Sequence, residues 1–495
     1  MSTKEELSSG NTANGVKSVQ EENVAMPTEA KIRWQHVILL PSIFGLMFSI
    51  VLNSYIQNEW TQWVIKKQYL PNVTESHSGC YQDQANISAT LEESYKTVQQ
   101  VTAKWQVFFT VAHNVPTVFT VLILPPYTDT YGRKFVLVLS AAGMCISAIG
   151  LCLTIYFEAS FWFILAAGVL CGITGSGFAL LTAAFSMVSD VTHTPKHRTI
   201  GIVITEASVM VSVIFSSYFS GFFIETIDLG YFYTSLLSAC ISCAAALLIL
   251  TVPETLTDDK KVKTQTVSQT LRSVSDFYVS AEFKGKRKVY FLLLIAFGFA
   301  TLGGINRGSM ETLYFLGKPF CWGPSKIGIF SMVRNASQTL IGLGAVRFLQ
   351  RCFSSEMVGI ISTLSNAASY VIEAFATTTL TIYLVPAAAC FAFLVVPMIR
   401  TILSSMTPVD KQGAMYASIT AMEIVCTMIA NLSQNAVYSF TLYFMNGFVF
   451  LMLAVLSIIN MLLMVAVRCF KTKDDNFEES VTIEKVDGKY GHDKL

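Results

Sequence analysis

About twelve long apolar segments run through this chain, and they limit what it can fold into. A bilayer core of about 30 Å needs roughly twenty apolar residues per crossing helix. Spans are expected at 36–57, 105–126, 135–157, 161–187, 200–224, 231–252, 290–316, 326–349, 356–378, 380–405, 413–437 and 443–467. Because these runs are continuous and do not alternate as barrel strands do, they predict an all-α membrane protein with twelve transmembrane helices in a lipid bilayer.

The charged residues predict how the chain is oriented. Only 14% of the 495 residues are charged, and the net charge of +1 gives no indication of a nucleic-acid partner. Residues 1–35 contain no apolar signal-peptide core, and their composition, like that of 468–495, predicts disorder. Lysine and arginine gather in the segment 253–289, which the positive-inside rule makes cytoplasmic together with both termini.

The long segment between the first two spans, 58–104, then lies outside the cytoplasm. It carries two N-glycosylation acceptors, Asn72-Val-Thr and Asn86-Ile-Ser. Of the eleven cysteines, only Cys80 and Cys321 fall in outside loops. An oxidising exterior favours a disulfide between them, with two free thiols as the alternative.

The spans divide into an N-terminal half, 36–252, and a C-terminal half, 290–467, joined by the polar linker 253–289. Such a six-plus-six layout resembles the major facilitator fold, whose halves hold a substrate at their interface near the bilayer midplane. The glycines of Gly172-Ile-Thr-Gly175-Ser-Gly177 follow no strand, so they indicate close helix packing and not a dinucleotide-binding loop.

Seven of the ionisable residues inside the expected spans are candidates for function, because a charge there costs on the order of 2.5–3.5 kcal/mol. They are His113, Glu206, Arg307, Glu311, Arg334, Arg400 and Glu423. Glu206, and Glu423 in the corresponding span of the other half, are candidates for loading and releasing a proton. A structural ion pair is the alternative for each.

The other five are candidates for contacting a substrate. Arg400 is expected to bind an anion or to pair with a carboxylate. Arg307 and Glu311 are four residues apart and can form a mutual salt bridge, so a structural role is the alternative for both. Arg334 has the same two interpretations. His113 is interpreted as a hydrogen-bonded packing residue, with a proton-transfer role as the alternative.

A short charged turn between the second and third spans suggests a cytoplasmic gate. The predicted gating residues are Asp129, Gly132, Arg133, Lys134, Asp190 and Arg198. Asp190, at the foot of the fourth span, is the expected partner of Arg133. Such a partly solvated pair contributes about 1 kcal/mol, enough to bias two conformations. An ordinary solvated loop is the alternative for the segment around Asp190.

Several motifs resemble the proton-coupled folate transporter family, which includes thymic stromal and lysosomal branches. They are Asp129-Thr-Tyr-Gly132-Arg133-Lys134, Ser189-Asp190-Val191, Glu206-Ala-Ser, Leu316-Gly-Lys-Pro-Phe-Cys321-Trp322, Arg400-Thr-Ile-Leu-Ser and Gln412-Gly413-Ala414. The resemblance spans both halves and implies symport of a small organic anion with protons. It further implies a coupling role for Glu206, a transport role for Arg400 and the Cys80–Cys321 disulfide.

One departure concerns the substrate. The folate-transporting branch is expected to carry a histidine in the seventh span, and 291–316 has none. The resemblance therefore extends to folate-like compounds, muropeptides and conjugated organic anions without choosing among them. A proton-independent carrier and a non-transporting receptor are the alternatives.

The remaining expectations concern chemistry and location. No enzyme activity, cofactor or metal is expected. The plasma membrane is favoured, with a lysosomal or endosomal membrane as the alternative. The oligomeric state is left open.

Overall fold

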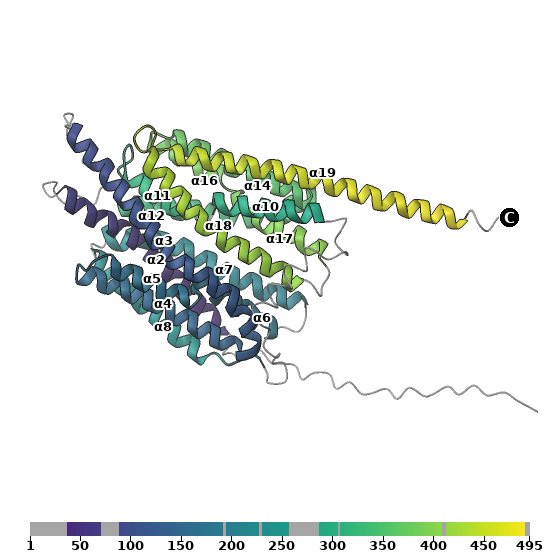
Figure 1. Cartoon of the computed structure of the whole chain (residues 1–495), viewed down its shortest axis with the longest axis horizontal. Helices are drawn as coiled ribbons and strands as arrows, with labels where there is room; N and C mark the ends of the chain where they lie inside the picture. The colour runs from purple at the N-terminus through teal and green to yellow at the C-terminus, as the bar shows by residue number, and fades with distance from the viewer. Residues whose placement is uncertain are drawn as a thin grey trace, which may run out of the picture.

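A computed structural model describes residues 37–70, 89–191, 195–226, 230–256, 287–304, 307–407 and 412–490. Across these ranges the chain is helical, with turns at the joints and no strand, so the all-α prediction is confirmed (Figure 1). Nine helical segments in this part of the chain are long and apolar enough to cross a membrane. Each of the expected spans contains helix.

The N-terminal half is built from long helices and one broken helix. They are α2 (Leu39–Tyr69), α3 (Ala89–Tyr131), α4 (Arg133–Tyr156), α5 (Trp162–Ile173), α6 (Ser176–Val191), α7 (Pro195–Gly221) and α8 (Gly230–Thr251). Helices α2 and α3 extend well into 58–104, so part of the expected outside loop is helical. Between α5 and α6 the chain turns at Gly175, whose φ of +85° suits glycine.

The C-terminal half contains more interruptions. Its helices are α10 (Arg287–Gly304), α11 (Arg307–Leu316), α12 (Pro324–Ala336), α13 (Leu343–Cys352), α14 (Ser355–Phe375), α15 (Thr379–Ile382), α16 (Val385–Ala388), α17 (Val395–Met406), α18 (Gln412–Thr441) and α19 (Phe448–Tyr490). A π-helical turn, Ser337–Gly342, joins α12 to α13. Pro324 occupies the first turn of α12, where its missing N–H costs nothing.

The last helix continues beyond the last expected span, into the segment whose composition predicts disorder. Helix α19 continues to Tyr490 and projects beyond the bundle (Figure 1). Lys471 is fixed to the bundle, because its Nζ lies 2.6 Å from Oε1 of Glu356 on α14. A helix already nucleated by its membrane span can propagate into polar sequence, since propagation costs less than nucleation.

Each half has its own apolar core. Leu46, Leu137 and Leu180 are fully buried in the N-terminal half, and Phe315 and Phe330 are fully buried in the C-terminal half. Figure 1 shows the purple-to-teal helices and the green-to-yellow helices as two groups lying side by side. The groups meet where α3 packs on α18 and α7 packs on α12.

Hydrogen bonds join the halves near the ends that the sequence places outside. Gln100 Nε2 donates to the Ser439 carbonyl at 2.9 Å. The Ser325 N–H donates to Glu225 Oε2 at 2.7 Å, at the start of α12. These contacts hold the outer ends of the two halves together.

Candidate functional site

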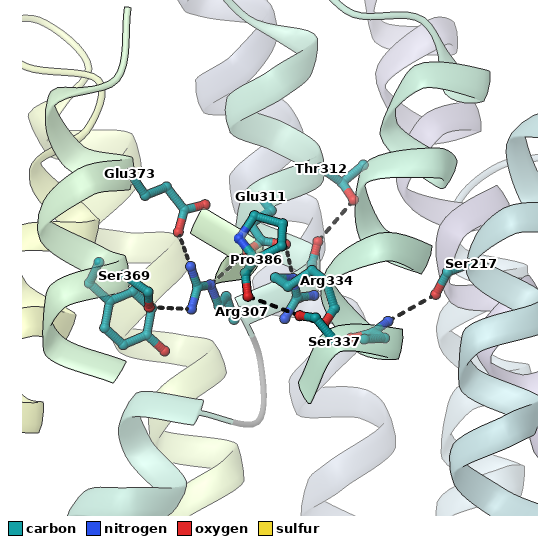
Figure 2. Close-up of polar contacts among 12 residues, drawn as sticks. Ser217, Arg307, Glu311, Thr312, Arg334, Ser337, Ser369, Glu373 and Pro386 are labelled. Carbon is teal, nitrogen blue, oxygen red and sulfur yellow. Dashed lines mark hydrogen bonds and ion pairs between the residues drawn. The ribbon is translucent and has the colours of Figure 1, made fainter. Parts of the chain in front are cut away.

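Four charged side chains form a buried cluster in the C-terminal half, which we call the ion quartet: Arg307 and Glu311 on α11, Arg334 on α12 and Glu373 on α14. Arg307 Nε lies 2.6 Å from Glu311 Oε1, and Arg307 Nη2 lies 2.6 Å from Glu373 Oε2. Arg334 Nε lies 3.0 Å from Glu311 Oε2. Figure 2 shows Arg307 held between the two carboxylates, so one guanidinium ties α11 to α14.

The quartet is closed to solvent. None of its four side chains is more than 7% exposed. Arg307 donates a further bond to Ser369 Oγ at 2.9 Å and stacks over the Tyr370 ring at 4.4 Å. Two arginines and two glutamates balance in charge, as buried ions require. This geometry supports the structural interpretation of Arg307, Glu311 and Arg334. It also confirms the expected i to i+4 pairing of Arg307 with Glu311 on α11.

Glu373 is a member of the quartet that the sequence interpretation missed. It lies within the apolar stretch 371–375, inside an expected span, so the same signal that identified Glu311 was present. Its Oε1 atom is buried and has no hydrogen-bond partner among the described residues.

A second group of charged residues lies between α17 and α18 and is partly open to solvent. Arg400 Nη2 lies 2.7 Å from Glu423 Oε2, and these side chains are 35% and 18% exposed. The Arg400 guanidinium also lies 5.5 Å from the centre of the Phe297 ring. The carboxylate-pairing alternative for Arg400 is therefore observed, on a side chain that stays 35% exposed.

Glu206 faces this pair from the opposite half. Its side chain is exposed on α7, and it interacts electrostatically with Arg400 on α17. The fold thus brings together three predicted residues that lie far apart in the sequence. We call Glu206, Arg400 and Glu423 the open triad.

His113 lies apart from both groups. Its ring nitrogens are 2.9 Å from Asn114 Oδ1 and 3.0 Å from Ser176 Oγ. A side chain at Gly172 would collide with the His113 carbonyl, which explains the glycine in α5 by close packing against α3. Both observations support the packing interpretation of His113 and of the glycine run.

At the cytoplasmic gate, Arg133 Nε lies 3.2 Å from Asp190 Oδ2, which is the expected pairing. Glu254, which the sequence interpretation missed, accepts hydrogen bonds from the backbone N–H groups of Arg133 and Lys134, both at 3.0 Å. Gly132 has φ +110°, and a side chain there would meet the Glu254 carboxylate. Lys134 Nζ donates to the Leu250 carbonyl at 2.7 Å.

Some predicted residues fall outside the described parts of the structure. The side chains of Asp129 and Arg198 are among them, as are Asn72, Asn86 and Cys80. Cys321 is disulfide-bonded. Because Cys80 is not described, its pairing with Cys321 stays a prediction.

Comparison with known proteins gives relatives over most of the chain. The Major Facilitator Superfamily profile matches residues 85–316. The human lysosomal proton-coupled steroid conjugate and bile acid symporter is 25% identical over 451 residues, covering 88% of this chain and 95% of that protein. The proton-coupled folate transporter of Bos taurus is 25% identical over 430 residues, covering 86% and 90%.

Solved structures share the fold at low sequence identity. A D-xylose–proton symporter superposes with a TM-score of 0.63 at 14% identity, covering 87% of this chain and 96% of its own. The human organic anion transporter MFSD10 gives a TM-score of 0.59 at 12% identity, covering 89% and 100%. The names of these relatives describe transporters and symporters. This chain therefore has the major facilitator fold, and over most of its length it is similar to the proton-coupled folate transporter family.

Proposed function

We propose that this protein is a symporter that carries an organic anion together with protons by alternating access. The open triad is the observation that supports this proposal most strongly. Its arginine is 35% exposed and pairs with Glu423, with the Glu206 carboxylate of the other half near enough to interact electrostatically, whereas the arginines of the ion quartet are buried and bound. The relatives named above include a proton-coupled steroid conjugate and bile acid symporter and a proton-coupled folate transporter.

Coupling follows from competition for Arg400. While Glu423 is ionised, it occupies the guanidinium at 2.7 Å, and Glu206 adds a second negative charge nearby. An incoming anion must displace one carboxylate, which is unfavourable while that carboxylate keeps its charge. A proton on the displaced carboxyl removes the repulsion, so anion and proton bind together.

Alternating access requires that the site open to one side at a time. The contacts between Gln100 and Ser439 and between Glu225 and Ser325 hold the outer ends together. The triad, with its exposed side chains, lies toward the cytoplasmic side of these contacts in the predicted topology. This arrangement supports an inward-facing state, from which an outward-facing state would form by rocking of the halves.

The predicted substrate is an amphipathic organic anion, and the plasma membrane is the proposed location. The experiment is uptake by purified protein in liposomes under an imposed inward proton gradient, with estrone 3-sulfate, folate and a muropeptide as separate solutes. We expect gradient-driven accumulation of at least one of them. Accumulation that persists after a protonophore collapses the gradient would instead indicate a proton-independent carrier.

Glu206→Gln tests the coupling step in the same liposomes. We expect uptake that no longer responds to the gradient, because the amide cannot carry a proton. Lys326→Gln is the matched control, since Lys326 lies at the start of α12, over the Trp322 ring and away from the triad. If Glu206→Gln kept the full pH response at matched protein amounts, Glu206 would have no part in proton coupling.

A further inference from the structure

A cavity lies between the outer ends of the two halves, apart from the open triad. Its volume is about 470 Å³, within the range of small-molecule sites. Lys66 and Gln99, from α2 and α3, line one side. Lys318, Ala376 and Asn446, from the C-terminal half, line the other. We call this space the outer cavity.

The charged side chains that the structure describes in the wall of the outer cavity are all lysines. They are Lys318 and, each with further interactions of its own, Lys66 and Lys96. The three cations come from three separate elements, so their convergence is a property of the fold and not of a single basic run. A cleft lined by charge of one sign concentrates counter-ions.

Five aromatic side chains also line the cavity. Tyr314, Phe375, Tyr443 and Phe444 line the cavity beside Tyr95. Such surfaces accept the apolar body of a ligand, while a few polar groups fix its orientation. The wall is also held in place, because Asn446 Nδ2 donates to the Lys318 carbonyl at 2.8 Å and Tyr443 Oη donates to Gln100 Oε1 at 3.4 Å.

The geometry points to a second binding site in the outer cavity, one that holds an amphipathic organic anion with its acidic group at Lys318 and its apolar body against the aromatic side chains. The site is made by both halves while their outer ends are in contact. A ligand there favours that state, because binding stabilises the conformation in which its site exists. The outer cavity is thus an external site that slows outward opening when the anion is abundant outside.

The cavity neighbours the ion quartet. Ala374, which follows Glu373 in the sequence, lines the cavity, and Tyr314 Oη, also in the lining, donates to the Glu373 carbonyl at 3.3 Å. The quartet is sealed and charge-balanced, so it supports this part of the wall and does not serve as an anion site itself. A ligand in the cavity is therefore separated from the open triad by packed protein.

The choice of ligand class rests on the proposed anion transport, whereas the site itself is tested by binding alone. The experiment uses the full chain in phosphatidylcholine nanodiscs and tritiated estrone 3-sulfate as the probe. Arg400→Gln serves as the background because it weakens the open triad. We expect residual saturable binding that unlabelled estrone 3-sulfate displaces and that neutral estrone does not displace.

Adding Lys318→Gln to this background is expected to weaken the residual binding by about fivefold, the effect of roughly 1 kcal/mol for one exposed charge contact. Lys318→Arg should retain binding, and Lys326→Gln should leave it unchanged. Thr377→Trp fills the cavity from an exposed lining position and should abolish binding even if Lys318→Gln yields too little folded protein. In liposomes, high external estrone 3-sulfate should inhibit wild-type uptake, and Thr377→Trp should relieve that inhibition.

Several results would overturn the outer site. The first is an absence of residual estrone 3-sulfate binding in Arg400→Gln, and the second is binding that survives both Lys318→Gln and Thr377→Trp. The third is estrone 3-sulfate binding that is lost only in phosphatidylserine-rich nanodiscs, which would assign the cavity to lipid headgroups. None of these depends on whether uptake is driven by protons. Conversely, gradient-independent uptake would contradict the proposed symport and leave the binding result standing.

Discussion

The ion quartet and the open triad are made of the same residue types, yet they differ in what surrounds them. In the quartet, Arg307 contacts Glu311, Glu373 and Ser369, and no side chain is appreciably exposed. In the triad, Arg400 has one close carboxylate and remains 35% exposed. A buried guanidinium with every partner in place is costly to disturb, whereas a half-solvated one can exchange partners.

This difference separates structural from functional charges within a membrane. The free-energy cost of placing a charge in the bilayer does not distinguish the two groups, because that cost applies to every ionisable residue in a membrane span. What distinguishes them is the balance of charge and the access of solvent. Substituting one residue of the ion quartet should therefore reduce folding, whereas substituting one residue of the open triad should reduce transport.

The largest effect is expected for Arg307→Gln. The substitution leaves Glu311 and Glu373 buried beside each other with too little positive charge, which costs about 3–5 kcal/mol. We expect little folded protein, measured as monodisperse material on size-exclusion chromatography and as the midpoint of thermal unfolding in detergent. Arg400→Gln is the control, and its unfolding midpoint should stay close to that of the wild type.

A well-folded Arg307→Gln protein that had lost only uptake would contradict the structural role of the ion quartet. The quartet would then be a substrate site, and its closed geometry would be one state of a cycle. Adding Glu373→Gln to Arg307→Gln sharpens the test. It removes an uncompensated charge, so we expect the double variant to recover part of the lost folding.

The next largest effect concerns transport and not folding. Arg400→Gln removes the group that an anion would contact, and uptake should fall roughly tenfold or more, since a hydrogen bond to a charged group contributes about 1.5–3 kcal/mol. Arg400→Lys keeps the charge but loses the planar fork, so a smaller loss is expected. Gradient-driven uptake in liposomes measures both. Unchanged uptake by Arg400→Gln would exclude the triad as the anion site.

Glu423→Gln should change the response to pH. The amide releases Arg400 without a proton, so uptake near neutral pH should equal or exceed that of the wild type, and stimulation by acid should weaken. One pH unit corresponds to a driving force of about 1.4 kcal/mol per proton, or roughly tenfold in the equilibrium constant. Uptake rates measured across external pH values test this. A variant that retained the wild-type slope would assign coupling to Glu206 alone.

The sequence predicts a contact between two charged residues best when both lie on one helix or in one recognisable motif. The i to i+4 spacing of Arg307 and Glu311 predicts their contact, because both lie on one helix. Motif position predicts the pairing of Arg133 with Asp190. Glu373 lies on a different helix, and no local spacing connects it with Arg307. The contrast in solvent access also required the packed structure, because periodicity does not show which ionisable residue faces the interface of the halves.

The smallest effect is expected at the gate. Glu254 accepts the first two backbone N–H groups of α4, from Arg133 and Lys134, as a side-chain cap would. Glu254→Gln keeps the shape but loses the negative charge at the positive end of the helix, at a cost of about 1 kcal/mol. We expect hydrogen exchange at those two amides to rise by roughly fivefold, measured by mass spectrometry.

Glu158→Gln is the matched control, because Glu158 belongs to an exposed ion pair with Lys67 whose side chains are 73% and 57% exposed. Exchange at Arg133 and Lys134 should not respond to it. If Glu254→Gln also raised the uptake rate, the cap would restrain a step of the transport cycle. If exchange did not change, Glu254 would add nothing to the stability of this turn. The Arg133–Asp190 pair would then remain as a contact that stabilises the closed gate. Because this pair is partly solvated, its effect on the equilibrium between the two conformations is small.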